Sequence, residues 1–263
     1  QELYYNGEPE ISDAEFDLLW DELKRLDPEN ALLRDVGADR ANGCPKRKHL
    51  MPMGSQDKAA DPGAFLKWAA KVEPESYVVQ LKLDGASLEL QYLDGAFTCG
   101  VTRGDGRIGD DITQNVRKMQ GVVAELPDRF SGSVRGEVLM SRSVHREKHA
   151  DKANTRNAAN GLMKRKDGVG TEDLVVICYD AWALGTELFF SSELSKLEWL
   201  SDAGFRVVDY RVLIDPGEVI AYREEVARQR GGLEFDIDGL VVKGPHIDVE
   251  DMLVSETTRL SII

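Results

Sequence analysis

The apolar residues at the start of the chain recur three or four positions apart, which is the spacing of one face of a helix. Those that follow this spacing are Phe16, Leu19, Trp20, Leu23 and Leu26. Ser12 and Glu15 are spaced as a capping box, in which each side chain accepts a hydrogen bond from the backbone N–H of the other residue. Asp27-Pro28 predicts the end of this helix.

From about residue 77 the apolar positions alternate with a period of two, which predicts β-strands. The segments "YVVQLKL" and "ASLELQYL" alternate in this way, and Asp94-Gly95 predicts a hairpin turn into "AFTCGVTRG". Further strands are expected in "SGSVRGEVLM", "DLVVICYDAWAL" and "FDIDGLVVKG", and helices at 62–72, 141–152, 190–203 and 216–230. This mixture favours an α+β fold of antiparallel sheets flanked by helices.

Two domains are expected, divided near residue 45. The segment "RDVGADRANGCPKRKH" has few apolar residues and several Gly and Pro positions, as a linker has. We therefore expect a small helical domain over residues 1–45 and a larger α+β domain over 46–263. A chain of 263 residues is long enough for both.

The composition excludes several classes of protein. With 42% hydrophobic and 30% charged residues it is ordinary for a soluble protein. There is neither an apolar run long enough to span a membrane nor a secretory leader, so we expect no membrane partner. Cys44, Cys99 and Cys178 form no CxxC pair, which argues against a zinc site and a disulfide framework and favours the reducing cytoplasm.

The charge argues against a free-standing nucleic-acid-binding protein. The formal net charge is −14, whereas proteins that bind nucleic acid alone usually carry a basic surface. Two short basic segments, "CPKRKH" at 44–49 and "LMKRKDG" at 162–168, are candidates for a local patch. A solvated surface explains each of them more simply.

Lys82 lies in "KLDG", at the end of an expected strand, and invites two interpretations. One is an exposed hairpin lysine; the other is a nucleophile. An amine attacks only when neutral, and a lysine of ordinary pKa is neutral in about one molecule in 2,500 at pH 7, a deficit of roughly 4.6 kcal/mol. A site that uses Lys82 must therefore favour the neutral amine by nearby cations or by removal from water.

Charged residues near the ends of the other expected strands favour the second interpretation. The cations are Arg103, Arg135, Arg156 and Lys243. The carboxylates, which could hold Mg²⁺, are Asp84, Glu137, Asp236 and Asp238. K-x-D-G alone is a weak signal, but together with these charged groups it favours a nucleophilic Lys82 over an exposed hairpin lysine.

These motifs resemble a known family. "KLDG", "TRGDGRIGDDITQNV", "VRGEV", "TRNAANG", "VICYD" and "FDIDGLVVK" resemble, in order and spacing, the nucleotidyltransferase motifs of NAD-dependent DNA ligases. Upstream, "YYNGEPEISDAEFDLLWDEL" is similar to the helical domain that binds the nicotinamide mononucleotide (NMN) half of NAD in that family, and "HLMPMGSQDKA" to the entry into the adenylation domain. The resemblance covers nearly the whole chain up to Lys243.

The resemblance implies a reaction and a site. Lys82 would attack the α-phosphate of NAD, form a phosphoramide-linked AMP and release NMN, the first step of nick sealing. Asp84 belongs to the same motif, and Lys243 would face the α-phosphate. Glu137 and Asp238 would be associated with Mg²⁺, which together with a lysine stabilises charge during phosphoryl transfer.

Further side chains resemble the contacts of the two halves of NAD. On the adenylate side, Tyr179 would stack on adenine, Glu137 would contact the ribose, and Arg103 and Arg156 the phosphate or ribose. The remaining candidates of that pocket are Ser55, Gln56 and Gln80. On the nicotinamide side, tyrosine faces and carboxylates suit a cationic ring; the candidates are Tyr4, Tyr5, Asp13 and Asp17.

The sequence departs from the family pattern at several positions. Gln80 replaces a glutamate that accepts from the adenine amine, and a glutamine carbonyl can still accept that bond. Phe16 replaces a tyrosine, Gln56 an apolar residue, and Thr155 a proline. After Lys243 a further motif lysine is absent, so we expect the adenylation domain to be incomplete and the chain to be a fragment of a longer, monomeric protein that seals nicked double-stranded DNA.

Two alternatives remain open at this stage. One is a nucleotidyltransferase that uses ATP or GTP, although a triphosphate gives the N-terminal segment nothing to recognise. The other is a module that binds NAD or DNA ends without turnover, which Gln80 and the absent lysine favour.

Overall fold

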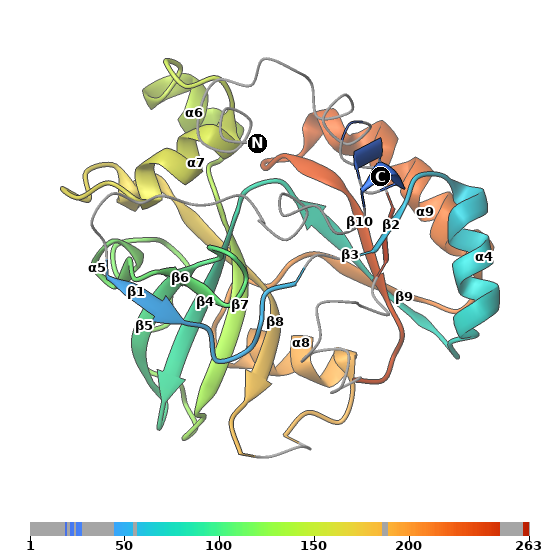
Figure 1. Cartoon of the computed structure of the whole chain (residues 1–263), viewed down its shortest axis with the longest axis horizontal. Helices are drawn as coiled ribbons and strands as arrows, with labels where there is room; N and C mark the ends of the chain where they lie inside the picture. The colour runs from blue at the N-terminus through green and yellow to red at the C-terminus, as the bar shows by residue number, and fades with distance from the viewer. Residues whose placement is uncertain are drawn as a thin grey trace.

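The computed structural model describes residues 19, 22–23, 25–27, 45–54, 57–185, 189–247 and 260–262. Two antiparallel-rich sheets, of four and five strands, lie against each other, and helices cover their outer sides (Figure 1). Within the described residues no helix is both long and apolar enough to cross a membrane.

The four-stranded sheet has the order β5-β4-β7-β8, and all its pairs are antiparallel. Its strands are β4 (Ala86–Leu93), β5 (Ala96–Thr102), β7 (Gly132–Leu139) and β8 (Val175–Ala183). One face forms the largest core with α5 (Thr113–Val116), α7 (Thr155–Met163) and α8 (Glu193–Asp202). Burial of these apolar side chains stabilises the sheet by roughly 25 cal/mol per Å² removed from water.

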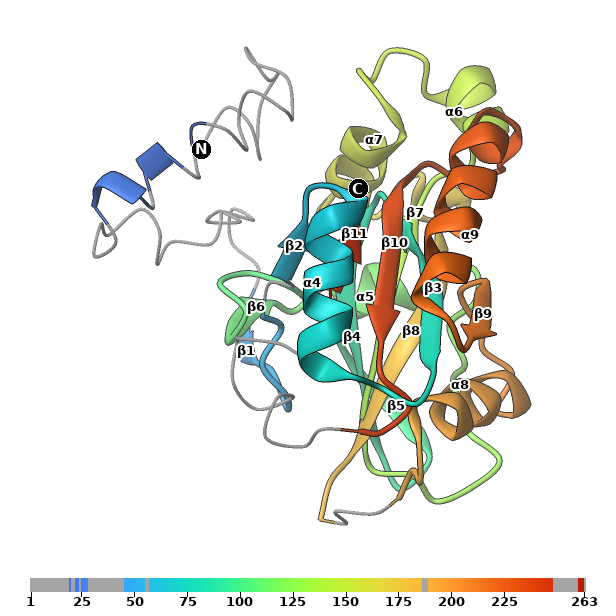
Figure 2. The same cartoon turned by 90° about the vertical axis from the view of Figure 1, so that its right-hand side faces the viewer.

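The five-stranded sheet has the order β2-β11-β10-β3-β9. Its strands are β2 (Asp57–Ala59), β3 (Tyr77–Leu83), β9 (Tyr210–Leu213), β10 (Ile237–Lys243) and β11 (Leu260–Ile262). Only the β2–β11 pair among these is parallel. The helices α4 (Pro62–Val72) and α9 (Pro216–Gln229) cover its outer face and build a second core there (Figure 2).

The remaining elements are short and lie at the edges. β1 (Lys46–Lys48) pairs with β6 (Ile108–Asp110), and α6 (Arg142–Lys148) precedes α7 at the upper end of the molecule in Figure 1. Single 3₁₀ turns at Thr171–Asp173 and Arg230–Gly232 lead into β8 and β10.

The α+β fold class predicted from the sequence is confirmed, and so are the six strands and the helix at 62–72. The helix expected at 141–152 is wrong in extent: α6 ends at Lys148, and a second helix, α7, begins after Asn154, whose side chain accepts from the N–H of Asn157. The helix expected near residues 12–28 falls mostly outside the described residues. The division into two domains near residue 45 stays a prediction, because most of residues 1–44 also lie outside them.

Candidate active site

Lys82 points from β3 toward the four-stranded sheet. The alternation of β3 sends Tyr77 and Val79 into the core beneath α4 and α9, so Gln80 and Lys82 occupy the opposite face. There the Lys82 Nζ donates to Asp238 Oδ2 at 2.7 Å. Burial would raise the pKa of Asp238, but the charge and hydrogen bond of Lys82 outweigh it and hold that pKa below its usual range.

A β-bulge aims Asp238 at this lysine. Ile237 pairs with Leu83 and Gly239 with Lys82, so Asp238 is an extra residue in β10. Gly239 has φ 141°, a conformation that residues with a side chain rarely adopt. Bulges of this kind re-aim a side chain and are frequent beside active sites.

Asp84 follows Lys82 at the turn between β3 and β4. Its Oδ1 accepts from Arg156 Nη1, on α7, at 3.2 Å, and its backbone N–H donates to the Asp236 carbonyl at 3.0 Å. The next residue has to be glycine because of space: a Cβ on Gly85 would lie 2.4 Å from the Val138 carbonyl oxygen. The "LDG" turn is therefore pressed against β7.

Glu137, on β7, is the buried carboxylate of the site. Its Oε2 accepts from the Ser87 hydroxyl at 3.1 Å. Burial raises the pKa of Glu137 to about 7, although the Ser87 hydrogen bond and the charges of Arg156, Lys82 and Arg103 act in the opposite direction. The charges of three cations therefore act on this one buried carboxylate.

Tyr179, on β8, also occupies a bulge. Arg135 pairs with Asp180 and Gly136 with Cys178, which leaves Tyr179 as the extra residue. Burial raises the pKa of its phenol, and the nearby Glu137 charge raises it further, so Tyr179 is neutral near pH 7. Its backbone carbonyl accepts from Gln80 Nε2 at 3.4 Å.

Lys243 lies on β10, at the other end of the site from Lys82. Lys243 pairs with Val78 and Gly239 with Lys82, so Lys243 lies four residues further along the sheet, about 13 Å from Lys82. Its Nζ donates to Glu193 Oε2 at 3.1 Å and to the Tyr179 carbonyl at 3.5 Å. The strand register therefore puts Lys243 at the Gln80–Tyr179 end of the site, and its expected place facing the α-phosphate stays a prediction.

Arg103 lies at the rim of the same site. Its Nε donates to the Met53 carbonyl at 3.3 Å, and its own carbonyl contacts His49 Nε2 at 3.0 Å. The candidates that lie outside the described residues are Tyr4, Tyr5, Asp13, Asp17, Ser55 and Gln56.

The donor chemistry of the site fits Mg²⁺. Mg²⁺ prefers oxygen ligands and is usually held by one or two carboxylates with waters and substrate phosphates. Glu137 and Asp238 both lie within the field of Lys82 and Arg156, so they face one region. Among the described residues no three acidic, His or Cys side chains gather as a cage, so the other ligands would be water and substrate oxygens.

Sequence reasoning missed two groups of side chains near the site. One is a buried chain of opposite charges behind Tyr179: Lys243, Glu193, Lys196 and Asp180, all at most 3% exposed. The other joins Asp236 to Arg142 and Thr155. Polar positions on the apolar strand "VICYDAW" and in the first turn of α8 were the available signal for the first group.

Comparison with known proteins decides the family. Residues 41–258 match the family model described as the NAD-dependent DNA ligase adenylation domain. The chain belongs to this family. It is 51% identical to a DNA ligase of Treponema denticola, over 96% of this chain and 41% of that protein. With a DNA ligase of Treponema pallidum the identity is 47%, over 95% of this chain and 32% of that protein.

The chain matches only part of each relative, and this limits which functions family membership assigns to it. The chain spans about a third to two fifths of the length of these DNA ligases. It corresponds to the adenylation domain of an NAD-dependent DNA ligase. The six nucleotidyltransferase motifs lie within residues 41–258, whereas the upstream segment at 4–23 precedes the match.

Proposed function

We propose that this adenylation domain transfers AMP from NAD to Lys82. The observation that carries the proposal is the convergence of Lys82, Asp84, Glu137, Arg156 and Asp238 from four separate elements onto one region. In the reaction the Lys82 nitrogen forms a bond to the α-phosphorus, the bond from that phosphorus to the NMN oxygen breaks, and the amine loses a proton.

Each charged side chain has a role that its position supports. Asp238 orients the Lys82 amine through the 2.7 Å hydrogen bond. Arg156, held by Asp84, presents a guanidinium to the phosphate, and Arg103 does so from the opposite rim. Glu137 and Asp238 would hold Mg²⁺, which when bound supplies positive charge against the phosphate oxygens.

The Tyr179 end of the site would take the base. Tyr179 offers an aromatic face, and Gln80 and Lys243 approach it with an amide and an ammonium group. Glu137 lies between this end and Lys82, where the ribose of the same nucleotide would lie. Ser55 and Gln56 complete the proposed pocket.

The NMN half would bind the N-terminal segment. Tyr4, Tyr5, Asp13 and Asp17 supply aromatic faces and carboxylates, which suit a cationic ring. Asp13→Ala or Tyr5→Ala should slow reaction with NAD but leave the attack of pyrophosphate on preformed lysyl-AMP unchanged. An equal loss in both assays would exclude the segment as the NMN site.

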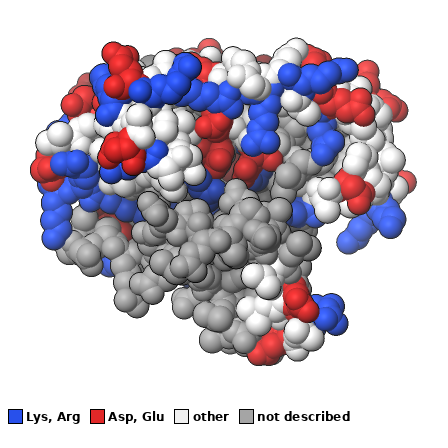
Figure 3. Space-filling view, turned by 90° about the horizontal axis from the view of Figure 1, so that it is seen from above, with Lys and Arg blue, Asp and Glu red and all other residues white. Residues whose placement is uncertain are grey.

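Nicked DNA is the partner we propose for the longer protein, as a cytoplasmic monomer. On the described part of the face in Figure 3, Lys and Arg side chains lie among Asp and Glu side chains. Such mixed charge, with a net charge of −14, favours a duplex held largely by other parts of that protein.

The test is the mass of the intact chain before and after incubation with NAD and Mg²⁺, with ATP in a parallel sample. We expect an increment of one AMP with NAD and none with Lys82→Ala or with ATP. An increment with ATP would move the chain to the ATP-dependent enzymes. NAD binding without an increment would instead favour a module without turnover.

A further inference from the structure

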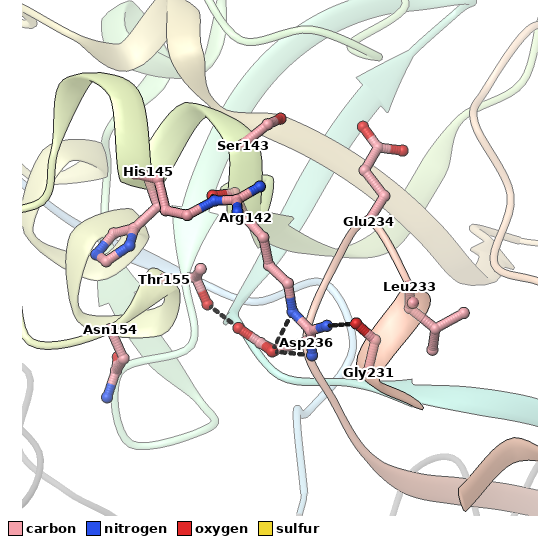
Figure 4. Close-up of a pocket in the computed structure, with 11 residues that line it drawn as sticks. Arg142, Ser143, His145, Asn154, Thr155, Gly231, Leu233, Glu234 and Asp236 are labelled. Carbon is pink, nitrogen blue, oxygen red and sulfur yellow. Dashed lines mark hydrogen bonds and ion pairs between the residues drawn. The ribbon is translucent and has the colours of Figure 1, made fainter. Parts of the chain in front are cut away.

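Asp236 is the centre of a polar cluster beside the site. Its Oδ1 accepts from Arg142 at 2.8 Å (Nε) and 2.6 Å (Nη2), and its Oδ2 accepts from the Thr155 hydroxyl at 2.6 Å (Figure 4). Arg142 belongs to α6, Thr155 to α7, and Asp236 directly precedes β10. One carboxylate therefore joins the start of β10 to two helices whose contacting residues lie 81 and 94 positions earlier in the sequence.

Each of these contacts leads to a residue of the proposed reaction. Thr155 directly precedes Arg156, and Asp236 precedes Asp238 by two residues. The Asp236 carbonyl also accepts from the N–H of Asp84 at 3.0 Å. A shift of this carboxylate would thus be passed to the phosphate-binding guanidinium, the Lys82 partner and the "LDG" turn together.

Arg142 also holds the segment of the chain that leads into β10. Its Nη1 donates to the carbonyls of Arg230 at 3.1 Å and Gly231 at 2.8 Å, and its backbone N–H donates to the Glu234 carbonyl at 3.0 Å. The segment that enters β10 is therefore tied to α6 at several backbone positions before Asp236 as well as at Asp236 itself.

Asp236 has little to do with the packed core. Its side chain and that of Arg142 are each 28% exposed, and they line an open hollow of about 490 Å³ (Figure 4). Removal of the carboxylate there leaves its charged partner, Arg142, in contact with water, although the Thr155 hydroxyl is buried. The hydrogen bonds of Asp236 therefore fix the relative positions of these elements, and its side chain contributes little to packing.

We propose that Asp236 is a positioning residue for adenylation of Lys82. Held by Arg142 and Thr155, its carboxylate sets α7 and the start of β10 at the separation at which Arg156 and Asp238 meet Asp84 and Lys82. The inference rests on the proposed function. Asp236 does not touch the substrate in this role, because both of its oxygens are engaged by the protein.

The experiment compares single-turnover formation of the AMP adduct over a range of NAD concentrations, read by intact mass. Asp236→Ala should lower the maximal rate by on the order of 100-fold, the loss expected from a displacement of about 1 Å. The NAD concentration at half-maximal rate should change less than threefold, because the base end is untouched. Asp236→Asn should recover at least tenfold of the lost rate, since its amide can still bond to Arg142 and Thr155.

A matched control is the carboxylate that binds the end of α6. Asp173 accepts from Lys148 at 2.6 Å and His149 at 3.0 Å, and these contacts involve neither Arg156 nor Asp238. Asp173→Ala should leave the adduct rate unchanged. Thr155→Val, which removes one hydroxyl at constant shape, should lower the maximal rate by roughly tenfold and keeps the test informative if Asp236→Ala unfolds.

The outcomes separate this inference from the proposal on which it rests. An unmodified chain that forms no adduct overturns both. A normal adduct rate in folded Asp236→Ala overturns the positioning role alone, as does an Asp236→Asn variant no faster than Asp236→Ala. A change in the NAD concentration at half-maximal rate, with the maximal rate unchanged, would make Asp236 a binding residue. That result would also overturn the positioning role.

Discussion

Two side chains of the site, Tyr179 and Asp238, are the extra residues of β-bulges on different sheets. A bulge turns one residue out of the regular alternation, so both side chains leave the faces that a regular strand would give them. The two bulges face the same region from opposite sheets, which is how two sheets without a shared edge build one site.

At the same scale, Gly85 is where a single added methyl group should matter most. In Gly85→Ala the Cβ would lie 2.4 Å from the Val138 carbonyl oxygen and 2.7 Å from the Leu139 side chain. The turn must move, so we expect a loss of roughly 1–3 kcal/mol in the free energy of unfolding and loss of adduct formation. Urea denaturation and intact mass measure the two effects.

Gly161→Ala is the control for that substitution. Gly161 lies in α7, where an added Cβ meets nothing within 4 Å. Alanine should stabilise the helix there by roughly 0.5–1 kcal/mol and leave the adduct intact. If Gly85→Ala behaved like this control, close packing against β7 would not explain the glycine.

The sequence could identify most site residues but not their separations. Lys82 and Asp84 lie in one short motif, so their proximity follows from the chain itself. The motif set names Lys243 as a site residue but does not give its distance from Lys82, which the antiparallel register sets at about four residues along the sheet. Register depends on partner strands distant in sequence, and one bulge shifts it further.

At the scale of elements, α8 is fastened to both sheets by buried ion pairs. Lys196 of α8 contacts Asp180 of β8 and Glu193 of its own first turn, and Glu193 contacts Lys243 of β10. The charges alternate along this chain, so each has an opposite neighbour. Such a chain holds the sheets in one orientation only while every member is present.

Lys196→Met should therefore be severely destabilising although methionine fits the volume. It leaves the carboxylates of Asp180 and Glu193 buried without their common partner, which costs roughly 3–5 kcal/mol. The urea midpoint measures this. Lys148→Met, which removes an exposed lysine from Asp173, is the control and should shift the midpoint only slightly. Equal shifts in the two variants would contradict the argument.

Elements were predictable where a single pattern dominates. The helix at 62–72 has an apolar face and begins at Asp61-Pro62, with the Asp61 side chain accepting from the N–H of Ala64. The break between α6 and α7 was not predictable, since no Gly or Pro marks "HADKAN". Tertiary contacts such as Thr155 with Asp236 decide that break.

At the scale of the molecule, acid should reduce stability through the buried pair of His49 with Glu89, which lies on the inner strand β4 of the four-stranded sheet. His49 Nδ1 lies 2.8 Å from Glu89 Oε2, and Gln91 Nε2 donates to the same oxygen at 2.9 Å. Burial would raise the pKa of Glu89, but the bonds from His49 and Gln91 outweigh it and hold the pKa below its ordinary 4.5.

The direction of the pH effect follows from that lowered pKa. The stabilisation from Glu89 is fully present above pH 4.5 and is lost as pH falls through the folded-state pKa below that value. Glu89→Gln should therefore unfold more easily than the unmodified chain at pH 7, with a difference that narrows below pH 4.5. Urea midpoints at a series of pH values measure this, and a constant difference at every pH would exclude Glu89 as the source.

The parallel pairing of β2 with β11 has a consequence for how the protein is made. β11, at Leu260–Ile262, lies between β2 and β10, and its side chains are at most 4% exposed. A ribosome that has released residues 57–243 has therefore delivered Lys82, Glu137 and Asp238 while the sheet beneath them still has two open edges. The five-stranded sheet cannot close between β2 and β10 until β11 emerges from the exit tunnel, so over that interval the unpaired backbone of both strands is open to other chains.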